Sequence, residues 1–187
     1  MTVYMIPPVC SPSATFTERQ IFNEIKDMKA KEDLYCFQSI GLEKHSTKEH
    51  AECDFVILTP RGVFCLEVKG GAIKRQNGMW TIGSGERSYT TAEGPFKQAE
   101  GCRWALLKYL QNRRVLDRRD TLFGWGVILP SVVFEYQDAE WSQEVVYDLR
   151  DLKSPFLAYL SRLTTYFEAK RTGKGNRLPT RLTSEKL

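Results

Sequence analysis

At 187 residues the chain is long enough for one well-buried domain and too short for two typical ones. Hydrophobic residues at 42% and charged residues at 27% are ordinary for a globular protein, and no apolar run reaches the roughly 18 residues of a membrane span. The first residues lack the basic and then apolar regions of a signal peptide. We therefore expect a cytoplasmic protein that does not bind membranes.

The cysteines and histidines do not indicate a zinc site or a disulfide framework. The five cysteines are odd in number, and no two have C-x-x-C spacing. His45 and His50 flank a polar stretch without a second pair of ligands, which disfavours a histidine-based metal site. The cysteines are Cys10, Cys36, Cys53, Cys65 and Cys102.

Positive charge is concentrated in two places. Residues 162–187 hold seven basic and two acidic residues, a local net of +5, so the rest of the +4 chain has a net of −1. The second cluster comprises Lys108, Arg113, Arg114, Arg118 and Arg119. Such clusters suit contact with a phosphate backbone. A solvated helix face and a basic tail would explain the same charges.

The first part of the chain is predicted to form a lead-in, a helix and a strand. Residues 1–16 are rich in Pro and Ser and indicate an extended segment. Thr17 is predicted to cap a helix over 17–31, with Glu18 in its first turn and Glu24 near the edge of its apolar stripe. A strand is expected at 34–40 and a loop at 41–50.

Two hairpins are predicted next. The stronger one joins strands at 52–58 and 63–68 through a turn that contains Pro60 and Gly62. The weaker one joins 72–74 to 79–82 through Asn77-Gly78, a pair that is typical of tight hairpin turns.

The remaining elements indicate an α/β fold. Helices are expected at 95–112 and from Pro155 to about residue 170, with strands at 125–129 and 145–147. Together they predict a central mixed sheet of about four core strands, flanked by helices, with a small extra hairpin. We assign residues 17–170 to this domain. Residues 171–187 form a basic tail that is either a free end or a linker to another domain.

The strong hairpin is expected to gather charged residues on one face. If Pro60 and Arg61 form the turn, residues i and 121−i lie opposite each other, so Asp54 faces Glu67 and Glu52 faces Lys69. The other face would hold four apolar residues, Cys53, Phe55, Leu66 and Val68. A bulge would shift this register.

A divalent cation would explain three carboxylates beside apolar strands. Like charges that oppose each other across strands are destabilising, and unpaired buried charges cost more. Asp54 and Glu67 offer the oxygen ligands that Mg²⁺ prefers, and Lys69 would lie beside a metal-bound water. Hydrolysis of a phosphodiester uses such a set. A Glu-x-Lys sequence also arises by chance, and cross-strand ion pairs also decorate surfaces.

The same residues resemble a known family. The segment from Ala51 to Gly71, with its Asp54 and its Glu67-Val68-Lys69, is similar to the core of the nuclease-related domain family, NERD, of the PD-(D/E)XK nuclease superfamily. The likeness covers about residues 17–130 and includes 78–80 and 94–99. The opening residues and 124–130 resemble the version that precedes superfamily 1 DNA helicases.

The resemblance implies a restriction-endonuclease-like fold and a metal-dependent site. Asp54 and Glu67 would bind Mg²⁺ or Mn²⁺, together with the backbone carbonyl of Val68. Lys69 would be the catalytic lysine. The proline that precedes the aspartate in the superfamily signature is absent here.

The resemblance also implies two catalytic residues on helices. Gln98 would help to position the site from the helix at 95–112, and Glu24 would contribute from the first helix. A solvated position on the helix would also explain Glu24, and a cap or bridge at the first turn would also explain Gln98. At Glu52 the family often has another polar residue, so its role is left open.

Three functions fit these observations. The first is a DNA nuclease acting in repair, recombination or defence together with a helicase. The second is a catalytically weak nucleic-acid-binding module that guides a fused or partner helicase. The third is a protein-interaction domain whose carboxylates hold a stabilising ion. The sequence leaves open the form of the DNA, the cut polarity and the oligomeric state.

Overall fold

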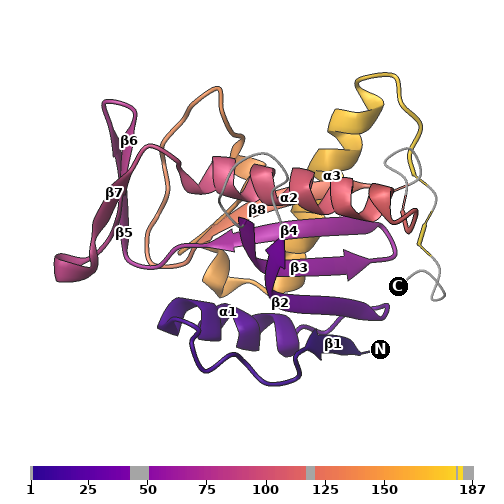
Figure 1. The fold of residues 1–187 in the computed structure, drawn as a ribbon, viewed down its shortest axis with the longest axis horizontal. Helices are drawn as coiled ribbons and strands as arrows, with labels where there is room; N and C mark the ends of the chain where they lie inside the picture. The colour runs from indigo at the N-terminus through magenta and orange to yellow at the C-terminus, as the bar shows by residue number, and fades with distance from the viewer. Residues whose placement is uncertain (1, 43–50, 117–120, 180, 183–187) are drawn as a thin grey trace.

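The computed structural model describes residues 2–42, 51–116, 121–179 and 181–182, and they form a mixed α/β fold (Figure 1). The central sheet has the order β1-β2-β3-β4-β8-β9, two strands more than the four core strands expected. Strand β3 pairs antiparallel with both β2 and β4, whereas β1 is parallel to β2, and β4, β8 and β9 are parallel. These strands are β1 Val3–Ile6, β2 Leu34–Leu42, β3 Ala51–Thr59, β4 Gly62–Val68, β8 Phe123–Leu129 and β9 Val146–Asp148.

A second, smaller sheet projects from the body beyond the start of α2 (Figure 1). It contains the expected weak hairpin, β5 Ala72–Gln76 and β6 Met79–Gly83, and an additional strand, β7 Tyr89–Thr91. Strand β7 has three residues and follows a short 3₁₀ turn, η1 Gly85–Arg87. Its polar sequence lacks the apolar alternation by which a strand is predicted.

Three helices cover the central sheet, and the architecture is that of the expected restriction-endonuclease-like fold. They are α1 Phe16–Lys26, α2 Pro95–Asn112 and α3 Phe156–Thr172. Side chains of α1 and α3 pack with Phe55 and Leu66 on one side of the sheet. Most of the buried face of α2 packs with Val56 and Cys65 on the other. Strand β4 is buried at every residue, as a central strand covered on both faces should be.

The first helix begins and ends earlier than the sequence indicates. Its N-cap is Thr15 and not Thr17, because Thr15 and Glu18 form a capping box: the Glu18 N–H donates to Thr15 Oγ1 (3.2 Å), and the Thr15 N–H donates to Glu18 Oε2 (3.1 Å). Thr17 is buried against Gly70. A Cβ atom at position 70 would collide with the Thr17 hydroxyl. Met28 is buried beyond the helix end, so the apolar spacing extended the prediction too far.

The turn after β3 sets the expected register. The paired residues run from Thr59↔Gly62 to Phe55↔Leu66, so each pair of numbers sums to 121. The prediction for Cys53 is wrong: its side chain clusters with Val56 and Cys65, on the α2 side. The β2–β3 pairing is interrupted opposite Asp54 at Ser39, whose φ of 52° is rare for a non-glycine residue.

Both ends of the described chain contact this fold. The lead-in contributes β1, an edge strand that its Pro- and Ser-rich surroundings conceal in the sequence. In the basic tail, the Leu182 side chain is buried and its N–H donates to the carbonyl of Pro60 (2.8 Å). None of the helices in the described ranges is both long and apolar enough to cross a bilayer.

The capping box gives a test of the revised start of α1. Thr15→Ala removes the side-chain acceptor for an N-terminal N–H, and we expect it to lower the free energy of unfolding by about 1 kcal/mol in urea denaturation. Ser13→Ala removes an exposed hydroxyl outside the helix and should change it by less than about 0.5 kcal/mol. Equal effects of the two substitutions would contradict the cap.

Candidate active site

Two carboxylates lie together at the end of the β3–β4 ladder, on two central strands of the sheet. The backbone N–H of Val68 donates to Asp54 Oδ2 at 2.7 Å, which fixes the aspartate beside the end of β4. Glu67 follows Leu66, the last residue of β4 that pairs with β3, and it is only 5% exposed. The hairpin thus brings Asp54 and Glu67 close enough for their charges to interact, although the paired ladder ends at Phe55↔Leu66 and does not include the predicted Asp54–Glu67 and Glu52–Lys69 pairs.

The proximity of these carboxylates makes their ionisation unfavourable. Burial and the charge of Glu67 raise the pKa of Asp54 from 3.8 to about 8, although the Val68 N–H and Lys69 act in the opposite direction. Burial also raises the pKa of Glu67, and Lys69 partly offsets this effect. Without a further positive charge, the pair is expected to retain a proton near neutral pH.

Lys69 provides a positive charge in the cluster. It directly follows β4, where its backbone N–H donates to the carbonyl of Ile128 on β8 (2.9 Å). Its Nζ lies 2.6 Å from Glu67 Oε1. Burial lowers the pKa of Lys69, but the charges of Glu67 and Asp54 outweigh burial and raise it above its usual value. The amine is therefore protonated at neutral pH.

Glu18 is a further carboxylate that acts on the pair, and it is absent from the predicted site residues. The charge of Glu18, at the start of α1, raises the pKa of both Asp54 and Glu67. Glu24, the predicted contributor from this helix, accepts a hydrogen bond from the hydroxyl of Tyr147 on β9 (2.6 Å). Glu18 was identified in the sequence only as a first-turn residue, and the proximity of Gly70 to Thr17 explains why the helix start lies near the site.

Glu52 lies at the exposed margin of the cluster. Its side chain is exposed, and its charge contributes to the raised pKa of Glu67. Its backbone carbonyl accepts a hydrogen bond from Cys102 Sγ on α2 (3.1 Å). The contact joins α2 to the β3 segment that carries Asp54.

Gln98 presents a buried acceptor from the first turns of α2. Among the residues that the structure describes, its Oε1 has no hydrogen-bond partner, which costs about 1–3 kcal/mol for a buried polar group. Cys102 lies one helical turn further on, and the charges of Glu67 and Asp54 help to raise its pKa, after its hydrogen bond to Cys53 and burial. The Gln98 turn of α2 therefore faces the same end of the hairpin as the carboxylates.

The donor set suits a hydrated magnesium or manganese ion. Mg²⁺ is commonly held by one or two carboxylates and keeps several waters. Asp54 and Glu67 provide two carboxylates, and the orphaned Gln98 oxygen lacks a positive partner. Within the described ranges, no three His, Cys, Asp or Glu side chains gather closely enough to hold a metal by themselves. An ion here would depend on the two carboxylates, backbone or amide oxygens, and water.

The predicted basic residues that the structure describes lie toward the C-terminal end of α2. Lys108, Arg113 and Arg114 are exposed at the C-terminal end of α2, and the guanidinium of Arg113 lies over the ring of Tyr109. Lys108 is ten residues from Gln98, about 15 Å along the axis of α2, and Arg113 and Arg114 follow at and after the helix end. Arg118 and Arg119 lie outside the described residues.

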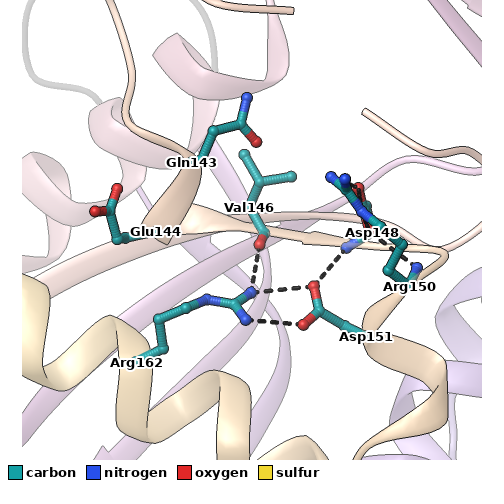
Figure 2. A pocket seen from close by; sticks show the side chains of 7 residues that line it. All are labelled: Gln143, Glu144, Val146, Asp148, Arg150, Asp151 and Arg162. Atoms are coloured by element: carbon teal, nitrogen blue, oxygen red, sulfur yellow. Dashed lines mark hydrogen bonds and ion pairs between the residues drawn. The ribbon is translucent and has the colours of Figure 1, made fainter. Parts of the chain in front are cut away.

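A separate pocket of about 280 Å³ lies between the β9 segment and α3 (Figure 2). Its charged groups bind one another: Arg162 donates to both oxygens of Asp151 and to the carbonyl of Val146, and Arg150 binds Asp148. None of the candidate catalytic residues lines it. We interpret these ion pairs as a brace between β9 and α3.

Comparisons with known proteins give one match. A family model described as the nuclease-related domain matches residues 13–135, more than half of the chain, and this range includes Asp54, Glu67, Lys69 and Gln98. No curated protein and no solved structure matches it. The chain belongs to the nuclease-related domain family, NERD.

Proposed function

We propose that this protein is a DNA nuclease that hydrolyses phosphodiester bonds with Mg²⁺ or Mn²⁺ bound at Asp54 and Glu67. The observation that carries the proposal is the pair of enclosed carboxylates with raised pKa values beside a protonated lysine. A divalent cation would remove their mutual repulsion and restore their ionised forms. Membership of a nuclease-related family supports the same chemistry.

Each side chain has a role that its surroundings favour. Asp54 and Glu67, with the carbonyl of Val68, would hold the ion, and Gln98 would direct its free oxygen toward the ion or a water bound to it. When bound, the ion would polarise the phosphate and lower the pKa of a coordinated water. Lys69 is protonated, so it is suited to stabilise negative charge on the phosphate and not to remove a proton.

The acidic residues of α1 would have indirect roles. Glu18 adds negative charge near the pair and would strengthen its attraction for a cation. Glu24 would act through its hydrogen bond with Tyr147, by fixing α1 against β9. We therefore place Glu18 closer to the reaction than Glu24.

DNA is the proposed substrate and a helicase the proposed partner. The exposed basic residues Lys108, Arg113 and Arg114 would contact phosphates away from the cleavage point. The resemblance to domains that precede superfamily 1 helicases supports action with a helicase in repair, recombination or defence. Residues 171–187 would then connect the two activities.

One observation favours a binding module with little turnover. The described residues contain no third acidic, histidine or cysteine ligand gathered with Asp54 and Glu67. A site with two carboxylates holds Mg²⁺ weakly unless substrate phosphates complete its coordination. Under this alternative, the domain would bind DNA and guide a helicase without cutting the strand.

Isosteric substitutions test the catalytic assignment. Asp54→Asn, Glu67→Gln and Lys69→Met preserve side-chain size but remove the charges proposed to bind the ion and the phosphate. We expect each to reduce the rate of cleavage of labelled DNA in Mn²⁺ by about 100-fold or more. Glu144→Gln, at the separate pocket, should leave the rate unchanged. Wild-type cleavage by all three site variants would refute the assignment.

The raised pKa of Asp54 predicts how metal-free stability depends on pH. Between about pH 4 and 8 the Asp54 carboxyl keeps its proton in the folded state but loses it in the unfolded state, so its contribution to the free energy of unfolding falls as pH rises. Asp54→Asn removes this titration. We expect the variant to melt at least about 3 °C above the wild type at pH 8, and the difference to shrink toward pH 4.

Thermal unfolding in EDTA at a series of pH values measures this difference. Added Mn²⁺ should raise the melting temperature of the wild type at pH 8 and should raise that of Asp54→Asn much less. A variant that is less stable than the wild type at pH 8 in EDTA would show that Asp54 is not a strained carboxylate.

A further inference from the structure

The small sheet is held beside the candidate site. Strand β5 begins at Ala72, three residues after Lys69, so the sheet leaves the body directly from the catalytic segment (Figure 1). Arg75 fastens it: the guanidinium lies 5.3 Å from the ring centroids of both Trp80 and Trp141. It also forms ion pairs with Asp138 and Glu140. These contacts join the small sheet to the 138–141 segment of the body.

The cross-strand pairing identifies the side of the sheet on which Tyr89 lies. Ile73 pairs with Ile82, and Ile82 pairs with Tyr89, so the three side chains project from the same face. Ile73 and Ile82 are buried in the main core. Tyr89, on the edge strand β7, is 47% exposed. Its ring thus lies at the rim of the face that turns toward the body.

Tyr89 is close to the catalytic lysine and has no structural partner. It lies within electrostatic range of Lys69. Within the part of the chain that the structure describes, its side chain makes no hydrogen bond, ion pair or ring contact. By contrast, Trp80 on β6 contacts both Phe96 and Trp141. The face of the Tyr89 ring is therefore uncovered by other rings of the described residues and accessible to a ligand beside Lys69.

We propose that Tyr89 is a stacking platform for an unpaired base of the DNA, next to the phosphate held at Asp54, Glu67 and Lys69. The inference rests on the proposed function and narrows its substrate. An aromatic face binds an unstacked base of any sequence, whereas bases inside a duplex are already stacked on one another. The substrate is therefore single-stranded DNA or a duplex end with an unpaired nucleotide.

Binding without cleavage tests this inference. We compare wild type, Tyr89→Phe, Tyr89→Ala and Thr90→Ala by fluorescence anisotropy, with a labelled oligothymidylate in Ca²⁺. Thr90 is the matched control because it lies on the same strand but on the opposite face, paired with Thr81. The same proteins are titrated with an oligomer of abasic sugar phosphates, which has no bases to stack.

The expected pattern is specific to stacking. Tyr89→Ala should weaken binding to oligothymidylate about tenfold, while Tyr89→Phe and Thr90→Ala stay within about twofold of the wild type. On the abasic oligomer, Tyr89→Ala should bind as the wild type does. A Tyr89→Ala variant with wild-type affinity for oligothymidylate would overturn the inference. An equal loss in Tyr89→Phe, or a loss on the abasic oligomer, would also overturn it.

Cleavage of the same oligothymidylate in Mn²⁺ is measured separately by wild type. Absence of cleavage with the predicted binding pattern would refute the nuclease proposal and retain the stacking site. Cleavage by wild type, with no effect of Tyr89→Ala on binding, would refute the stacking site and support the nuclease proposal.

Discussion

The structure depends on the placement of two carboxylates at the enclosed end of a hairpin. Asp54 and Glu67 are held by the central strands β3 and β4, where the core on both sides of the sheet prevents them from moving apart. Their repulsion is opposed by one backbone N–H and one lysine. Repulsion between these carboxylates lowers the stability of the folded state. Proteins retain such unfavourable interactions mainly at functional sites. A bound cation is the simplest way to relieve it.

Several elements converge on this point. The β2–β3 ladder is interrupted opposite Asp54, at Ser39, so the strand that carries the aspartate departs from regular alternation there. Helix α2 carries Cys102, which responds to the charges of Asp54 and Glu67, and Gln98 lies one turn earlier on the same helix. Helix α1 adds the charge of Glu18. The small sheet leaves from Lys69 and carries Tyr89 to the rim. The site is assembled from the ends of elements around a rigid sheet.

Local sequence signals predicted the elements that carry the hairpin. The Pro60-Arg61 turn fixed its register, and Pro95 marked the start of α2, because turn geometry and proline act over a few residues. Contacts between distant segments were not predictable in this way. The burial of Thr17 against Gly70 moved the helix cap to Thr15 and brought Glu18 near the site.

The errors at Cys53 and β7 have similar causes. Strict alternation along β3 predicts that Cys53 and Phe55 share a face. The β2–β3 ladder is interrupted at Ser39, next to the pair that Cys53 forms, and the Cys53 side chain packs with Val56 and Cys65 instead. Strand β7 is short and polar, and it exists because β6 offers a free edge. The sequence pattern therefore does not predict that Tyr89 lies beside the candidate site. Its position follows only from the pairing of three strands.

The most direct test of this account is Mn²⁺ binding followed by electron paramagnetic resonance at pH 7.5, in the absence of DNA. The account predicts that the wild type binds Mn²⁺, that Asp54→Asn and Glu67→Gln lose this binding, and that Glu144→Gln retains it. Equal Mn²⁺ binding by all four proteins, or no binding by the wild type at millimolar Mn²⁺, would contradict a metal site at the Asp54–Glu67 pair.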